Sequence, residues 1–382
     1  MKKSNVSKRA LALHKKLGGK IRIVPAAPIR NRKELALVYT PGVAAVSSHV
    51  AKNKKDARIY TMKGRSVAVI SDGSAVLGLG NIGALGALPV MEGKAAIFKT
   101  FADIDTVPIV LDTQDADEIV ETVIRIAPAF GGINLEDIAA PKCFEIERRV
   151  IEALDIPVMH DDQHGTAIVV LAGVINAMKV VKKNINTCRV VVSGVGAAGV
   201  ATIKLLKLYA PKVKIIAVDS TGIISKRRKD LNSTKRELLA KNAIVAGDEG
   251  DLKDAVRGAD VFLGVSKPGV LTAAMVRTMA PRAVIFAMAN PTPEIMPNEA
   301  KKGGAMVIGT GRSDFPNQIN NSLAFPGVFR GALDNRVKKI TDRMKINAAK
   351  AIAGLIKNPT PNRVIPDMFD KRAPKAVAKV IR

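Results

Sequence analysis

A glycine-rich loop between an expected strand and an expected helix constrains the fold of this chain more than any other segment. Residues 188–193 are mostly apolar and β-branched, as in a buried strand, and residues 200–209 have the spacing of a helix. Three glycines lie in the loop between them: Gly194, Gly196 and Gly199. The next expected strand, 213–218, ends in Asp219, about 20 residues after the last glycine. This order predicts the first half of a Rossmann-type unit.

The spacing of the loop is typical of dinucleotide binding. The first glycine permits a tight turn, the second lets a pyrophosphate approach the backbone, and the third lets the helix pack closely on the strand. The N-terminus of the helix offers N–H donors to the phosphates, and the acidic residue would accept hydrogen bonds from the adenosine ribose. A purely structural turn is the alternative. We assign the dinucleotide to six residues of this segment: Gly194, Gly196, Ala197, Ala198, Gly199 and Asp219.

A second polar motif lies between an expected short strand at 156–159 and an apolar helix at 167–181. It places two carboxylates, Asp161 and Asp162, between two histidines, and such a group is costly to bury without a positive charge. A divalent cation would supply that charge. The alternative is a polar turn in which aspartate and threonine cap the helix.

Another adjacent carboxylate pair, Glu136 and Asp137, ends an earlier apolar run, and an expected helix at 143–154 leads from it to the motif above. Two acidic pairs at the carboxyl ends of two strands can converge on one point. Because hard cations prefer oxygen ligands, Glu136, Asp137 and Asp162 form a plausible site for magnesium or manganese.

Lys94 lies among small and apolar residues, where burial could lower its pKa, although a lysine is more often solvated. Residues 78–83 have the spacing G-x-G-x-x-G, but the preceding strand ends too early for a nucleotide loop. We interpret them as a tight turn into a helix at 84–91. Asn290 and Asn320 follow later strands, where open α/β sheets bind ligands, although turn chemistry also explains a loop asparagine.

The alternation of strands and helices predicts an α/β protein with two domains, at 10–155 and 163–382. The net charge of +26 allows nucleic-acid binding, but the basic residues are scattered and the chain has no Trp and three Tyr. A basic surface that attracts anionic substrates is the simpler interpretation. Two cysteines and no secretory signal favour the cytoplasm, and no apolar run reaches the roughly 18 residues of a membrane span.

Taken together, the motifs resemble those of the short prokaryotic malic enzymes. The resemblance runs from about Ala10 past Leu333, which leaves little room for a transit peptide before it. It rests on segments in the same order: Tyr39 to Ala44, Ser71 to Gly83, Gly93-Lys94, His160 to Thr166, Asn290 to Thr292 and Thr310 to Gln318.

The resemblance implies a malic-enzyme domain followed by an NAD(P)-binding domain, and it implies residue roles. Lys94 matches the general base, Tyr39 the general acid and Asp161 a carboxylate that supports the base. Glu136, Asp137 and Asp162 match the metal ligands. Asn290 and Asn320 match contacts to the substrate carboxylate, and we also place Asn290 near the cofactor. Ala75 stands where longer relatives have a substrate-binding arginine, and Phe315 stands where a tyrosine is expected.

The implied activity is metal-dependent oxidative decarboxylation of L-malate to pyruvate, by a cytoplasmic homodimer. A dehydrogenase that stops at oxaloacetate, a malolactic enzyme, and a basic Rossmann-type protein that binds nucleic acid without turnover are the alternatives. Asp219 favours NAD, since its charge would repel a 2′-phosphate, but Ser220 and the basic residues 226–229 could accommodate NADP.

Overall fold

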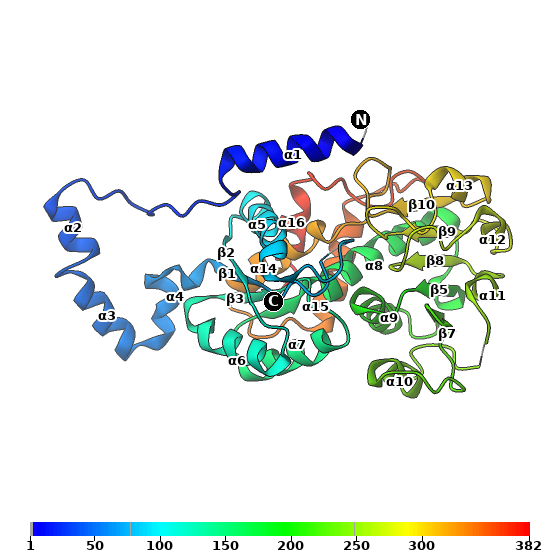
Figure 1. Ribbon diagram of the computed structural model, residues 1–382, viewed down its shortest axis with the longest axis horizontal. Helices are drawn as coiled ribbons and strands as arrows, with labels where there is room; N and C mark the ends of the chain where they lie inside the picture. The colour runs from blue at the N-terminus through cyan, green and yellow to red at the C-terminus, as the bar shows by residue number, and fades with distance from the viewer. Residues whose placement is uncertain (1–2, 77, 248) are drawn as a thin grey trace.

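The computed structural model describes residues 3–76, 78–247 and 249–382, and it contains two α/β units joined by one long helix (Figure 1). Each unit is built on a largely parallel sheet, which confirms the predicted α/β class. Parallel strands are covered on both faces, and this explains the runs of Val and Ile in the sequence.

The first unit has a four-stranded parallel sheet of order β2-β1-β3-β4. Its strands are β1 (Ser66–Ser71), β2 (Asp105–Val110), β3 (Gly132–Leu135) and β4 (Val158–His160). Its helices are α5 (Gly83–Ala102), α6 (Ala116–Ile126) and α7 (Lys142–Ala153). In the pairing of β3 with β4, Leu135 lies opposite His160. The two acidic pairs that follow these strands therefore begin side by side.

The second unit has a six-stranded sheet of order β10-β9-β8-β5-β6-β7, parallel except for β7. Its strands are β5 (Arg189–Ser193), β6 (Lys214–Asp219), β7 (Gly222–Ile223), β8 (Val261–Gly264), β9 (Val284–Ala287) and β10 (Val307–Thr310). The chain order reverses between β5 and β8, which is where doubly wound sheets open a crevice for ligands.

Five helices connect strands of this second sheet, and three more follow its last strand and end the described chain. They are α9 (Ala197–Tyr209), α10 (Ser233–Ala240), α11 (Leu252–Val256), α12 (Ala273–Arg277), α13 (Pro297–Lys302), α14 (Phe325–Asp334), α15 (Asp342–Gly354) and α16 (Arg372–Ala378). Short 3₁₀ turns lie at Lys54–Asp56, Met62–Gly64, Ala127–Ala129, Ile185–Thr187 and Asn321–Leu323.

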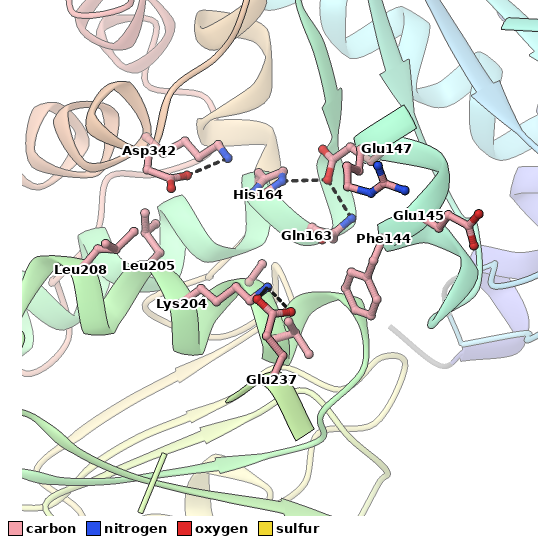
Figure 2. Close-up of a pocket in the computed structure, with 14 residues that line it drawn as sticks. Phe144, Glu145, Glu147, Gln163, His164, Lys204, Leu205, Leu208, Glu237 and Asp342 are labelled. Atoms are coloured by element: carbon pink, nitrogen blue, oxygen red, sulfur yellow. Dashed lines mark hydrogen bonds and ion pairs between the residues drawn. The ribbon is translucent and has the colours of Figure 1, made fainter. Parts of the chain in front are cut away.

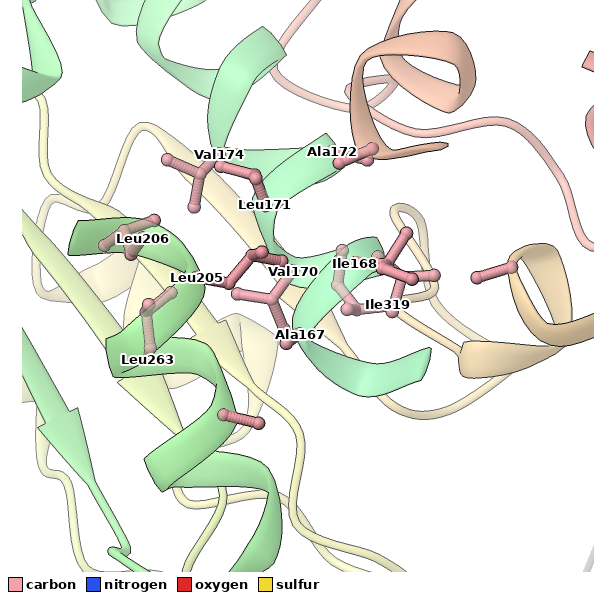
Figure 3. Close-up of a cluster of buried hydrophobic side chains, with 14 of the residues drawn as sticks. Ala167, Ile168, Val170, Leu171, Ala172, Val174, Leu205, Leu206, Leu263 and Ile319 are labelled. Atoms are coloured by element: carbon pink, nitrogen blue, oxygen red, sulfur yellow. The ribbon is translucent and has the colours of Figure 1, made fainter. Parts of the chain in front are cut away.

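Helix α8 (Asp161–Val181) connects the two units, and it follows the first sheet without a loop because it begins at the residue after β4. It packs along α9 and α15, and Figure 3 shows its side chains against Leu205 of α9 and Ile319. By length and composition α8 could cross a membrane, but 72% of its most apolar window is buried inside the protein. Burial between the two units accounts for its apolar character.

Four helices precede the first strand: α1 (Lys3–Leu17), α2 (Arg32–Val38), α3 (Val43–Lys52) and α4 (Ala57–Tyr60). Figure 1 shows α2, α3 and α4 as an arm that projects away from both sheets. None of these three helices, which the structure describes in full, has a buried residue. Large apolar side chains of the arm are exposed to water, including Leu37, Tyr39 and Ile59. The described part of the chain therefore supplies no surface that covers the arm.

Local signals set several element boundaries. Asp115 caps α6 by accepting hydrogen bonds from the backbone N–H groups of Asp117 and Glu118. The turn at 78–83 leads into α5 as expected, but α5 extends well beyond residue 91 and carries Lys94 inside it. Phe98, also on α5, stacks edge-to-face on Phe325 of α14. This contact fixes the helix that carries Lys94 against α14, which also lies against Gly132 of β3.

Candidate active site

Three carboxylates converge at the carboxyl edge of the first sheet. Glu136 and Asp137 follow β3, and Asp162 lies in the first turn of α8, directly after β4. One oxygen from each lies within 4.8 Å of the others. Asp137 has a left-handed backbone, with φ of 53°, and its N–H donates to Asp162 Oδ2 at 2.7 Å. The strand register therefore brings together the predicted ligand set.

Lys94 points from α5 into the same group of acids. Its Nζ lies 2.7 Å from Glu136 Oε1 and 2.7 Å from Asp161 Oδ2, and 4.3 Å from the centre of the Phe325 ring. Burial alone would lower the pKa of Lys94, but the carboxylates of Asp161 and Glu136 outweigh burial and raise the pKa above its ordinary value. The expectation that burial lowers the pKa of Lys94 was wrong, because it took no account of these partners.

The acids outnumber the cation that faces them. Burial raises the pKa of Glu136 well above its ordinary value, and Lys94 offsets this only in part, since Asp162, Asp161 and Asp137 act in the same direction as burial. Three hard oxygen donors on two rigid elements suit a divalent cation such as Mg²⁺ or Mn²⁺, whose charge would offset theirs. The donor set thus fits the predicted metal.

A cavity of about 670 Å³ opens beside these carboxylates, between the two units. Lys94, Glu136, Asp137 and Asp162 line it on one side, and Ala197 and Ala198 at the start of α9 line it on the other. Asn290 and Asn320 also line this cavity, so both predicted asparagines lie at the site. The Asn320 side chain accepts a hydrogen bond from the Ser322 N–H, which fixes its direction.

Asp161 lies beneath the cavity and is fully buried. Gly165, four residues later on α8, has a packing role that was not predicted from the sequence. A Cβ at Gly165 would stand 1.7 Å from Asp161 Oδ1, so only glycine leaves room for the carboxylate that holds Lys94. The available signal was a glycine in the first turns of an otherwise apolar helix, where its low helix propensity suggests a packing reason.

Tyr39 is not brought to this site by its own chain. It lies at the C-terminal end of α2 in the projecting arm, with 65% of its surface exposed, and it is not among the residues that line the cavity. The motif around Tyr39 was recognisable from the sequence. Its position on an arm that projects from both folded units was not predictable from the sequence.

A second cavity of about 770 Å³ follows the predicted dinucleotide loop. Gly194 and Asp219 line it, and Gly196 and Ser266 line both this cavity and the first one. Gly194 has φ of 98°, and a Cβ at Gly199 would stand 1.9 Å from the Gly194 carbonyl oxygen. A dinucleotide along this path would extend from Asp219 to the cavity that holds Lys94.

Asp219 is bound by two cations that the sequence analysis did not pair with it. Arg228 donates to both carboxylate oxygens, at 2.7 and 3.1 Å, and Lys235 Nζ donates to Oδ2 at 2.6 Å. Although burial opposes them, these hydrogen bonds lower the pKa of Asp219 to about 2. The charge expected to repel a 2′-phosphate is therefore offset by neighbouring cations.

Comparison with known proteins matches both halves of the chain. The family profile "Malic enzyme, N-terminal domain" matches residues 18–151, and "Malic enzyme, NAD binding domain" matches residues 163–380. The chain is 52% identical to the bifunctional malic/malolactic enzyme of Bacillus subtilis, over 99% of this chain and 92% of that protein. It is 46% identical to an NADP-dependent malic enzyme of Halomonas elongata, over 95% of this chain and 86% of that one.

A solved structure agrees with these matches. The crystal structure of the NAD-dependent malic enzyme of Thermotoga maritima superposes with a TM-score of 0.94 at 47% identity, covering 97% of this chain and 98% of that one.

Two of the three glycines of the dinucleotide loop, Gly196 and Gly199, allow a paired test. A Cβ at Gly196 meets no heavy atom within 4 Å, so Gly196→Ala should change the free energy of unfolding by less than about 0.5 kcal/mol and weaken dinucleotide binding. Gly199→Ala should instead destabilise the protein by about 1–3 kcal/mol, because its Cβ overlaps a backbone oxygen. Thermal denaturation and fluorescence titration with NADH measure the two effects. Unchanged NADH affinity in Gly196→Ala would refute the proposed approach of the pyrophosphate.

Proposed function

The chain belongs to the malic enzyme family and catalyses the oxidative decarboxylation of malate to pyruvate and carbon dioxide with reduction of NAD(P), and on this premise we propose the roles of its residues. One observation supports the assignment most directly. The buried Lys94 and the carboxylates around it face a cavity that shares Gly196 and Ser266 with the predicted dinucleotide path.

Glu136, Asp137 and Asp162 are the proposed ligands of Mg²⁺ or Mn²⁺. The support is their convergence within 4.8 Å and the excess of buried negative charge around them. A bound divalent cation supplies Lewis acidity toward the hydroxyl and carboxylate oxygens of malate. Asn290 and Asn320, on the opposite wall of the cavity, are positioned to orient a substrate carboxylate, and Asn290 also lies near the proposed nicotinamide end.

Lys94 is the proposed general base for the malate 2-hydroxyl. Its Nζ is the basic atom at the cavity wall, and Asp161 holds it in place from below at 2.7 Å. Burial raises the pKa of Asp161 to about 6, still below the raised pKa of Lys94, so the proton stays on the lysine. The charge of a bound divalent cation would have to lower the pKa of Lys94 before its amine could accept the hydroxyl proton. Both groups are fixed before substrate binds, as general acid–base catalysis requires.

Metal removal tests the ligand assignment. Treatment with a chelator should abolish NAD(P)H formation from malate, measured as absorbance at 340 nm together with a pyruvate assay, and added Mn²⁺ should restore it. Glu136→Gln should weaken Mn²⁺ binding at least ~10-fold by electron paramagnetic resonance, since a charged ligand is lost. Glu121→Gln, at an exposed position on α6, is the control. Full activity after exhaustive chelation would overturn the proposal. Lactate in place of pyruvate would indicate the malolactic alternative.

The proposed active unit is a homodimer in which the arm of one chain completes the cavity of the other. The arm exposes apolar side chains that a monomer would leave in water, among them Leu37, Tyr39 and Ile59. A second copy of the chain is the partner that can cover them symmetrically. In this arrangement Tyr39 of one protomer would supply the proton that C3 gains after carbon dioxide leaves, at the Lys94 site of its partner, and this step yields pyruvate.

Complementation between two inactive variants tests this exchange. Lys94→Ala and Tyr39→Phe should each lose at least ~10²-fold in kcat, the usual effect of removing a general acid or base. If chains are mixed at random by unfolding and refolding together, about half of the dimers are mixed, and each has one intact site. Activity should then recover to about a quarter of the wild-type value.

The same mixture distinguishes this arrangement from one in which Tyr39 serves the site of its own chain. If Tyr39 served the site of its own chain, neither protomer of a mixed dimer would have both groups, and no activity would return. Each variant unfolded and refolded alone is the matched control.

For the dinucleotide we propose NAD as the preferred cofactor, with NADP also accepted. Asp219 disfavours a 2′-phosphate, but Arg228 and Lys235 offset its charge, and Lys235 itself lines the cavity. Among the relatives compared, one is named an NADP-dependent malic enzyme and one an NAD-dependent malic enzyme, which is consistent with a small preference for NAD over NADP. A cytoplasmic location is also proposed, supported by two buried free cysteines.

Lys235→Gln should lower kcat/KM with NADP more than kcat/KM with NAD, so that the ratio of the NADP value to the NAD value falls about 10-fold. The reason is the loss of one positive charge that would face the 2′-phosphate, which is worth roughly 1.4 kcal/mol. Steady-state kinetics with both cofactors measure the ratio. Lys241→Gln, an exposed lysine just beyond α10, is the control. An unchanged ratio in Lys235→Gln would show that Lys235 does not set cofactor choice.

A further inference from the structure

Behind the proposed metal ligand Asp162 lies a cluster of four buried or half-buried polar side chains that no role above uses. Figure 2 shows Glu147 of α7 facing Gln163 and His164 of α8, and His160 lies at the end of β4 beside them. Glu147, Gln163 and His160 are at most 6% exposed. Their contacts form a chain from Glu147 through Gln163 and His160 to Asp162.

Glu147 is the acceptor at one end of this cluster. Its Oε1 accepts the His160 backbone N–H at 2.8 Å, and its Oε2 accepts from Gln163 Nε2 and lies 3.0 Å from His164 Nε2. Burial alone would raise the pKa of Glu147, but His164 outweighs it and lowers the pKa to about 2. At neutral pH Glu147 is therefore a carboxylate and can only accept.

This carboxylate fixes the orientation of the Gln163 amide. Gln163 Nε2 lies 3.0 Å from Glu147 Oε2 and also 3.0 Å from His160 Nδ1. Since the amide nitrogen carries two hydrogens, it donates one to each neighbour. The Nδ1 atom of His160 must then accept. Burial alone would lower the pKa of His160 and Asp162 raises it, but a proton on Nδ1 would face an amide hydrogen of Gln163, so this geometry requires a neutral ring with its proton on Nε2.

His160 Nε2 faces the proposed metal ligand. It lies 3.3 Å from Asp162 Oδ2, a contact longer and less well aligned than the hydrogen bonds above, and its ring is fully buried. The same oxygen accepts the Asp137 N–H at 2.7 Å. Two N–H groups directed at one carboxylate oxygen would leave the other oxygen for a cation.

We propose that Glu147 and Gln163 are positioning residues that set the tautomer of His160, so that an N–H rather than a lone pair faces Asp162 and orients it for the metal. This inference rests on the proposed function, since it takes Asp162 as a metal ligand. Groups that orient metal ligands commonly change metal affinity by ~10- to 100-fold when they are altered.

Glu147→Gln tests the proposal by reversing the cluster. The introduced amide must keep its oxygen on the backbone N–H of His160, so its NH₂ group points at Gln163. The Gln163 amide then turns over to accept from that NH₂ group. Its oxygen therefore faces His160 Nδ1. We expect the imidazole proton to move to Nδ1 and Mn²⁺ affinity to fall ~10- to 100-fold, with a much smaller change in kcat at saturating Mn²⁺. The chain has four histidines, so ¹⁵N spectra of histidine-labelled protein can report the tautomer.

Two further variants separate this role from a general loss of structure. Gln163→Met retains the Glu147 carboxylate but removes the donor to His160, and it should weaken Mn²⁺ binding in the same way, even if Glu147→Gln does not fold. Glu145→Gln, two residues from Glu147 on α7 and on the rim of the same pocket, should change neither the ¹⁵N spectrum nor Mn²⁺ affinity.

The readouts also separate failure of the inference from failure of the metal site. Tautomer spectra are recorded without metal, and wild-type Mn²⁺ binding is compared with Glu136→Gln. If wild type binds Mn²⁺ and Glu136→Gln does not, the metal site stands. Unchanged Mn²⁺ affinity in Glu147→Gln and Gln163→Met would then overturn the positioning role. So would a wild-type His160 that carries a proton on Nδ1, either alone or as the imidazolium cation.

Discussion

The buried Lys94 ammonium is the interaction on which the arrangement of the site depends. It contacts Glu136 and Asp161 at 2.7 Å each, and among the residues that line the cavity in the described part of the chain it is the one cation. Removing one partner of a buried ion pair leaves an uncompensated charge, which is far more costly than losing a surface pair. The position of α5, the start of α8 and the end of β3 are therefore coupled through a single amine.

Helix α8 extends this coupling to the second unit. Its first turn carries Asp161 and Asp162, and its later turns form the core that packs on α9, the helix of the dinucleotide loop. The helix that carries the proposed metal ligand Asp162 and the helix that follows the dinucleotide loop are therefore in direct contact. A rigid apolar core between them sets the distance from substrate to cofactor, which hydride transfer requires to be short and constant.

The sequence allowed prediction of those features that are local or follow from strand order. The loop around Gly194 was predictable because its spacing reflects backbone sterics, and the convergence of Glu136 with Asp162 followed from two parallel strands ending at one edge. The raised pKa of Lys94 and the pairing of Asp219 with Arg228 and Lys235 were not predictable, since they depend on which side chains meet across the fold. Glu147 did leave a signal, an acid at the buried-face spacing of an amphipathic helix beside Ile146 and Val150.

The projecting arm has a consequence for how the protein responds to its own abundance. If Tyr39 serves the neighbouring chain, a separated protomer holds the base, the acids and the nucleotide path but lacks the acid that finishes the reaction. Dissociation of the dimer then abolishes the activity of each protomer, because no separated protomer has a complete active site. At dilutions where dimers separate, working sites would increase with the square of chain concentration, so output would rise more steeply than the amount of protein made.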